Sequence, residues 1–183
     1  MFSRRSRLLI LVVIGITLVS GTVIGSPTTS VVGSPDIMAT LDDNTVTPGE
    51  QKSIEISLVN TGDLDSGSAQ NPALNNEVTT AKGLTVSLES SDAPISVKNS
   101  KRSLGRLEAG PKMTVPFDIS VDEDASSGTY DAQLRLEYEY INEIDEITGS
   151  RDENRETQTV AIEIDVTDDA TFSLTNIKSN ARV

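Results

Sequence analysis

Apolar residues alternate with polar ones over much of the chain between residues 36 and 167. This period of two predicts β-strands with one buried and one solvated face, because successive side chains of a strand point to opposite sides. The apolar members of the predicted strands are Ile37, Ala39 and Leu41; Ile54, Ile56 and Leu58; Leu84, Val86 and Leu88; Ile95 and Val97; Val115, Phe117, Ile119 and Val121; Ala132, Leu134, Leu136 and Tyr138; and Val160, Ile162, Ile164 and Val166. Seven to eight short strands of this kind predict an all-β, immunoglobulin-like antiparallel sandwich.

Turn-forming residues punctuate the strands. Asn60-Thr61-Gly62 and Gly110-Pro111 predict turns, and a further turn is expected at Gly105; all three glycines suit a positive φ. Pro116 cannot donate a backbone hydrogen bond, so its strand is expected to have an open edge or a bulge. Tyr130 follows a glycine at the start of the longest strand and predicts a tyrosine corner, in which the hydroxyl bonds to nearby backbone.

Two segments interrupt the alternation. Residues 63–82 are polar and aperiodic and predict a long connection without regular structure. Residues 141–157 join the last two long strands and predict a projecting hairpin. No amphipathic helix is expected after the N-terminal segment.

The first 25 residues have the order of a secretory signal: three arginines, an apolar run over residues 8–24, and small residues from Ser20 to Ser26. The run is also just long enough for an N-terminal membrane anchor, so cleavage and retention both remain open. Residues 26–35 are rich in Ser, Thr, Pro and Gly and predict a flexible spacer. No later segment is apolar enough to predict a membrane span.

These boundaries predict four parts: residues 1–25 as signal or anchor, 26–35 as spacer, 36–167 as the sandwich, and 168–183 as an extra strand or the start of a truncated second repeat. Phe172 and Leu174 alternate with polar residues in that last part. An apolar strand of this kind needs a partner, because an unpaired strand edge promotes aggregation.

The absence of Cys and His narrows the chemistry. It excludes disulfides, a cysteine nucleophile, and thiolate or imidazole ligands for zinc. The net charge is −13, and it becomes −16, from 12 basic and 28 acidic side chains, once the three N-terminal arginines are set aside. Such a charge disfavours nucleic acid and anionic membrane surfaces. It is typical of proteins adapted to strong salt, although an ordinary acidic secreted domain fits as well.

Three short segments resemble archaeal surface proteins. Residues 54–62 resemble the second strand and following turn of haloarchaeal-type immunoglobulin-like domains related to S-layer, CARDB and NEW3 families. Residues 104–110 are similar to a Leu-Gly-x-Leu-x-x-Gly turn of these domains, and residues 127–130 to the entry of their sixth strand. The resemblance covers residues 36–167 and implies a non-catalytic domain of the cell surface.

Acidic clusters are the only candidates for a metal site or for acid chemistry. Residues 63–67 follow the start of a calcium loop, but Gly67 and Leu74 occupy positions that must supply ligands. A looser calcium site at residues 122–124 and a paired-carboxylate site at residues 143–146 are weighed against solvated acidic loops, which we favour. The members of these two clusters are Asp122, Glu123 and Asp124, and Glu143, Asp145 and Glu146.

Sugar binding by stacking has only Tyr138 and Tyr140 to draw on, because the chain lacks Trp. We therefore assign no catalytic, cofactor-binding or metal-binding residue. The expected function is a secreted or cell-surface module with a structural, adhesion or interaction role, which contacts envelope or membrane proteins through strand edges and loops. The alternatives are an extracellular accessory subunit of a transporter or secretion complex, and a calcium- or polysaccharide-binding module.

Overall fold

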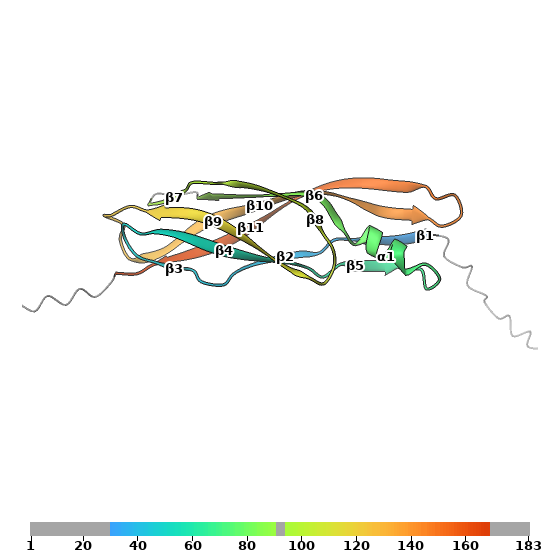
Figure 1. Ribbon diagram of the computed structural model, residues 1–183, viewed down its shortest axis with the longest axis horizontal. Coiled ribbons are helices and arrows are strands. Elements are labelled where there is room, and N and C mark those ends of the chain that lie inside the picture. Colours follow the sequence, from blue (N-terminus) through green and yellow to red (C-terminus); the bar gives the residue numbers. More distant parts are fainter. Residues whose placement is uncertain (1–29, 91–93, 169–183) are drawn as a thin grey trace, which may run out of the picture.

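The alternating segments form the two sheets of a sandwich in the computed structural model, which describes residues 30–90 and 94–168 (Figure 1). The larger sheet has seven strands: β1 (Ser30–Ser34), β3 (Thr45–Val46), β5 (Asp63–Ser66), β6 (Ala81–Ser90), β8 (Lys101–Leu107), β10 (Gly128–Asp145) and β11 (Arg151–Val166). The smaller sheet has four: β2 (Ile37–Leu41), β4 (Gln51–Asn60), β7 (Ile95–Val97) and β9 (Lys112–Val121). The prediction of an all-β sandwich is confirmed.

Strand β10 organises the larger sheet. One of its edges pairs with β11 along nearly the whole strand, while the other pairs first with β6 and then with β1. Strand β8 lies outside β6, and β5 lies outside β1. All these pairs are antiparallel; only the two-residue contact of β3 with β11 is parallel. The smaller sheet has the order β2-β4-β9-β7.

The predicted inward faces of the strands form one continuous core between the sheets. Phe117, Leu84 and Leu134 are fully buried, as the alternation in their strands predicts. The corner at Tyr130 is also confirmed, because its hydroxyl donates a 2.9 Å hydrogen bond to the carbonyl of Ser126. The glycines at 62, 105 and 110 all have positive φ.

Strand β1 corrects the prediction of a flexible spacer over residues 26–35. Residues 30–34 of that segment form a paired strand, in which Val31 is only 1% exposed. Its pairing partner on β10 lies more than a hundred positions away. Local composition therefore cannot reveal that such a short segment finds partners.

The connection over residues 63–82 is also more regular than predicted. It holds β5, the helix α1 (Pro72–Val78), which buries Val78, and the first residues of β6, so the expectation of no amphipathic helix was wrong. Pro72 suits the start of a helix because its missing N–H would have no partner there. The hydroxyls of Thr79 and Thr80 donate to carbonyls of the last turn, those of Asn75 and Asn76. A helix of seven residues has little stability of its own and depends on packing.

Two smaller expectations concern the strand edges. Gly105 lies within β8, where the pairing with β6 shifts register, and not in a turn between two strands. Pro116 is at an open edge as predicted, since β7 pairs with β9 only at residues 119–121.

Strands β10 and β11 extend well past the smaller sheet as a hairpin, so the projection predicted for residues 141–157 is confirmed (Figure 1). The proposed signal or anchor and most of residues 168–183 lie outside the described residues. Within residues 30–90 and 94–168, no helix has the length and apolar character needed to cross a membrane.

Candidate functional site: the braced arm

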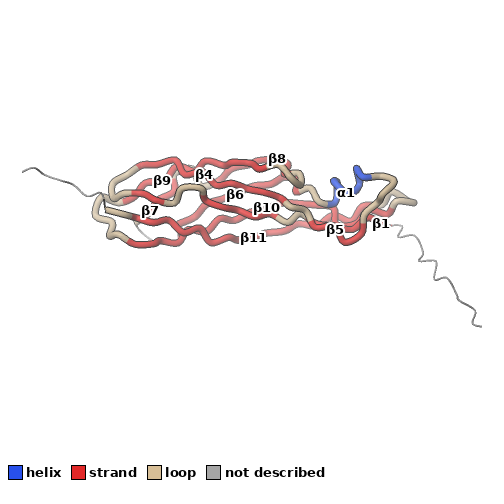
Figure 2. The backbone as a smooth tube through the Cα atoms, turned by 90° about the horizontal axis from the view of Figure 1, so that it is seen from below, coloured by secondary structure: helices blue, strands red, loops and turns tan. Residues whose placement is uncertain are grey.

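The projecting part of the hairpin, residues 141–154, is here called the arm. Strand β1 pairs with the arm up to its tip turn, with Ser30 opposite Asp145 and Val31 opposite Ile144. Strand β5 then pairs with β1, and α1 packs against both β1 and β10. The arm, β1, β5 and α1 together form the arm end of the molecule (Figure 2).

A second, small core holds the arm end together, separate from the main core. Its buried members are Val31, Val78, Ile141 and Ile144, each no more than 2% exposed, with Leu74 partly buried beside them. Four side chains bury far less apolar surface than the main core does. We therefore expect the arm end to be the less stable part of the molecule.

A bulge in β10 creates this second core. Residues 132, 134, 136 and 138 of β10 face the main core, so by alternation Ile141 faces the opposite side of the sheet. The pairing with β11 then skips one residue, Asn142, between Ile141 and Glu143. The extra residue reverses the alternation and brings Ile144 to the same face as Ile141. That face is the one α1 covers.

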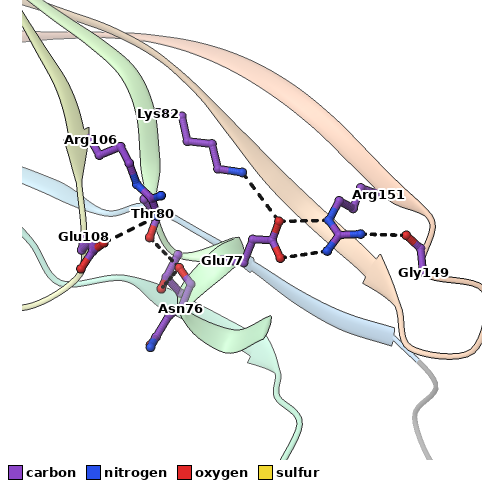
Figure 3. A network of polar contacts seen from close by, with 9 residues as sticks. Asn76, Glu77, Thr80, Lys82, Arg106, Glu108, Gly149 and Arg151 are labelled. Carbon is purple, nitrogen blue, oxygen red and sulfur yellow. Dashed lines mark hydrogen bonds and ion pairs between the residues drawn. The ribbon is translucent and has the colours of Figure 1, made fainter. Parts of the chain in front are cut away.

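An ion-pair clamp fixes α1 to the arm on this same face (Figure 3). The guanidinium of Arg151 donates from Nε to Oε1 of Glu77 at 3.0 Å and from Nη2 to Oε2 at 3.1 Å. A third donor, Nη1, binds the carbonyl of Gly149 at 2.9 Å, and Lys82 approaches Glu77 at 3.8 Å. The hydrogen bonds from Arg151 hold the pKa of the Glu77 carboxyl below its usual range.

Replacing Glu77 by glutamine is expected to speed amide exchange in α1 severalfold without changing exchange in the main core. The lowered pKa determines how the stability of the arm end depends on pH. Stabilisation by ionised Glu77 is fully present above its ordinary pKa of 4.5 and disappears as the pH falls through the folded-state pKa. Wild-type α1 should therefore also loosen in acid. Exchange measured by mass spectrometry at neutral and acidic pH tests this, because the variant should lose the pH dependence that the clamp causes.

The control is Glu108→Gln. Glu108 pairs with Arg106 at 3.6 Å, but both side chains are more than 60% exposed, so this pair should contribute little. Equal exchange rates in α1 for wild type and Glu77→Gln would show that the clamp does not hold the helix.

The turn at the arm tip presents an apolar side chain on a rigid frame. One carboxylate oxygen of Asp145 accepts the backbone N–H groups of Ile147 and Thr148, both at 2.8 Å. The Gly149 N–H donates to the Asp145 carbonyl, which closes the turn. Ile147 stands at the apex with 77% of its surface exposed.

This use of Asp145 opposes the paired-carboxylate alternative. The two backbone donors hold the pKa of its carboxyl below the usual range, whereas a general acid needs a raised pKa. Glu143 lies opposite Asp152 in the strand pairing, and Glu146 is in the exposed turn. The structure thus brings these three acids together only as parts of a turn and the strand leading into it.

The two tyrosines offer little surface for stacking on a sugar. Tyr138 is only 3% exposed, and its ring lies 6.2 Å from that of Tyr140 at a tilted angle. Burial and the neighbouring Glu156 raise the pKa of the Tyr138 phenol. Tyr138 belongs to the main core, as its place in the alternation predicts.

The two calcium candidates lie in different parts of the molecule. Asp63 and Asp65 are in β5 at the arm end, while residues 122–124 are in the loop between β9 and β10. In the part of the chain that the structure describes, no three acidic side chains gather closely enough to hold a metal ion.

A shallow hollow of about 290 Å³ lies over Gly83 on β6, beside β10 and β11. Arg155 and Glu139 form an ion pair within it, and Arg135 binds the nearby Glu137 at 2.7 Å. The bond from Arg135 holds the pKa of the Glu137 carboxyl below its usual range. The charged groups there already neutralise one another, which leaves little to recognise a ligand.

The sequence predicts only that Asn60 belongs to a turn, but the structure gives its side chain a larger role. Its side chain is fully buried and makes four hydrogen bonds at the base of the arm end. The amide nitrogen donates to the carbonyls of Thr79 at 2.8 Å and Leu107 at 2.9 Å. The amide oxygen accepts the N–H groups of Asp36 and Gly62, both at 3.0 Å. One side chain thus ties β4 to the ends of the α1 segment and of β8, and to the start of β2.

The fold and this site define an all-β sandwich protein that carries a braced hairpin arm. The chain matches no protein-family model and no curated protein. Among solved structures it is similar to the sporulation control protein Spo0M from Bacillus subtilis, with 11% identity and a TM-score of 0.34. That match covers 74% of this chain and 50% of Spo0M, so the chain matches only half the length of that structure.

A second similar structure is AvmM, which is described as catalysing macrocyclization in alchivemycin A biosynthesis. The identity is 11% and the TM-score 0.33, over 76% of this chain and 92% of AvmM. At these TM-scores neither likeness bears on the activity of this chain.

Proposed function

We propose that this chain is an exported, non-catalytic, immunoglobulin-like module of the cell envelope with a structural or interaction role. Three features of the sequence support the proposal. The N-terminal sequence has the order of a secretory signal or anchor, and the strongly acidic composition suits an exposed, salt-rich setting. The resemblance of residues 54–62, 104–110 and 127–130 to archaeal surface domains points the same way.

The single observation that carries the proposal is the position of the two chain ends. The described chain begins at Ser30 beside the arm tip, and β11 ends at Val166 at the opposite end of an elongated molecule (Figure 1). A module that receives the chain at one end and releases it at the other can act as a spacer. The clamp and the second core keep the arm end aligned with the sandwich, which a spacer requires.

This arrangement gives the module a direction. Five residues separate Ile24 from Ser30, and they can span at most roughly 18 Å. If residues 8–24 remain in a membrane, the arm tip faces that membrane and the sandwich points away. In the second candidate function, an accessory subunit, Ile147 at the arm tip would be the exposed apolar side chain nearest a membrane partner.

Intact-mass analysis of the native protein from membrane and culture-medium fractions tests the proposal. A mass beginning between Gly21 and Ser26 in the medium would support a released module and oppose the accessory subunit. A full-length mass confined to the membrane would support a tethered one. A full-length mass found only in the soluble cell interior would contradict export altogether.

A further inference from the structure

The larger sheet has two long open edges on opposite sides of the molecule (Figure 2). Among the described residues, β8 pairs only with β6, and β11 pairs only with β10 and, at Asp165 and Val166, with β3. The edge of β11 therefore has no backbone pairing over residues 152–164, and the side chain of Gln158 donates to the Ile37 carbonyl of β2. Open edges of this length are the usual sites at which another strand adds to a sheet.

The outward hydrogen-bonding groups of β11 can be assigned from its far end. The Asp165 N–H donates to the carbonyl of Asn44, on the side away from β10. The register of β11 shows no skipped residue of its own, so alternate positions point the same way, including Arg155, Thr157 and Thr159. Their N–H and C=O groups are placed to pair with an incoming strand.

The edge at β8 carries an unusual charge for this protein. Residues 98–107 hold four basic side chains and no acid, in a chain with a net charge of −13. They are Lys98, which precedes β8 and donates to Gln51, and Lys101, Arg102 and Arg106 within the strand, of which Arg106 is paired at 3.6 Å with the exposed Glu108. Residues 151–165 along the β11 edge instead hold five acids and two arginines, and both arginines are already paired, Arg151 with Glu77 and Arg155 with Glu139. Strand β8 is thus predominantly basic and β11 predominantly acidic, with Glu153 and Glu156 among the acids of the open β11 edge.

The directions of β8 and β11, and their positions along the sheet, also allow them to pair between two copies. Neighbours in the order β11-β10-β6-β8 are antiparallel, so β8 runs opposite to β11. A second copy placed beside the first by simple translation would bring its β11 antiparallel to β8. Successive pairing partners put Lys101 level with Ser87, Arg135 and Thr159, and the opposite end of β8 lies near the level of Arg155. Translation therefore sets β8 against an open part of β11.

We infer that copies of this protein associate side by side, with β8 of one copy pairing with the open edge of β11 of the next. Backbone hydrogen bonds supply the affinity, and the opposite charges fix the partner and the register. Because the two edges differ, a pair of copies still has one free β8 edge and one free β11 edge. Further copies can add there, so the assembly grows as an open ribbon of rods. This inference deepens the proposed envelope role by naming a second copy as the partner.

Salt should govern the assembly. The large net negative charge repels copies at low ionic strength, and screening at about 1 M salt shortens that repulsion to roughly 3 Å while contacts within the edge persist. We expect light scattering of the purified full chain, kept in mild detergent because of its apolar N-terminus, to show a monomer in dilute salt and growing oligomers in concentrated salt.

A charge exchange tests the pairing directly. Variant one carries Lys101→Glu and Arg106→Glu; variant two carries Glu153→Lys and Glu156→Lys. Each alone places like charges on both edges and should remain monomeric where wild type assembles. An equimolar mixture should assemble, because each β8 then faces a complementary β11 in the other variant. Arg102 is left unchanged because it donates to the carbonyl of Pro116.

Thr157→Pro provides a test that is independent of charge. It removes one outward N–H of β11 without removing a hydrogen bond to β10, so the fold should persist while assembly weakens. Circular dichroism confirms the fold of every variant. Wild type that stays monomeric at all salt concentrations, or variants that assemble as well as wild type, would overturn the inference. So would a wild type that stays monomeric and instead binds an acidic polysaccharide through the β8 edge.

The outcomes separate this inference from the proposed function. A monomer found in the medium leaves the envelope role intact and removes the ribbon. A protein that assembles through β8 and β11 but is found only inside the cell leaves the interface and removes the envelope role.

Discussion

Replacing Asn60 by leucine is expected to lower the free energy of unfolding by about 3–5 kcal/mol. Leucine has nearly the same shape but cannot bond to the four backbone groups that the Asn60 amide satisfies. Two carbonyls and two N–H groups would lose their partners at a fully buried position, and each such loss costs about 1–3 kcal/mol before relaxation. Equilibrium unfolding in guanidinium chloride measures the change.

Two further variants sharpen the test. Asn60→Asp keeps the shape and the acceptor but removes both donors and sets a carboxylate against the carbonyls of Thr79 and Leu107, so it should also destabilise strongly. Asn99→Leu is the matched control, because Asn99 is exposed and makes one side-chain hydrogen bond, to Asp118. A loss of under about 1 kcal/mol for Asn60→Leu would mean that water replaces the amide, and that Asn60 does not secure the base of the arm end.

Replacing Gly33 by alanine should destabilise the arm end by about 2–3 kcal/mol, because overpacking forces backbone or side chains to move. An added Cβ would lie 2.6 Å from the backbone carbonyl oxygen of Asp63 and 2.9 Å from Cγ2 of Val78. The carbonyl cannot retreat freely, since Asp63 lies opposite Ser34 in the pairing of β5 with β1. The clash would push α1 and β5 away from β1.

Hydrogen exchange is the appropriate measurement, because the small second core should open locally before the sandwich unfolds. Exchange should accelerate in β5 and α1 and remain slow in β4 and β9. Gly128→Ala is the control: no atom lies within 4 Å of its added Cβ, and its φ lies outside the left-handed region. If the protection of α1 from exchange is unchanged in Gly33→Ala, β1 and α1 do not pack closely at Gly33.

Asn60 and Gly33 both help to position α1. The Asn60 side chain on β4 donates to the carbonyl of Thr79, the residue that follows the last turn of α1, and Gly33 lets α1 approach β1 closely. The clamp from Glu77 to Arg151 then holds the helix on the arm. A substitution at Asn60, at Gly33 or in the clamp should loosen the arm end before the rest of the molecule. The proposed spacer role depends on that end staying rigid.

The sequence by itself determined the sandwich, because period-two alternation is a local property of each strand. Leu84, Val86 and Leu88 point the same way whatever their partners are, and burying such faces requires a second sheet. The same holds for Tyr130, whose hydroxyl bonds only four residues back, and for the glycines with positive φ. The hairpin over residues 141–157 was likewise predictable, since it joins two strands that are neighbours in the chain.

Only the tertiary structure decided the arm end, because its interactions join residues far apart in the chain. Val31 is buried against Ile144, Glu77 bonds to a residue 74 positions away, and Asn60 reaches Leu107 across 47. None of these leaves a local pattern: β1 has five residues, α1 has seven, and the bulge at Asn142 breaks the alternation that would have placed Ile144. The open edges of β8 and β11 also follow from strand order, which pairing across the whole chain sets and no single segment encodes.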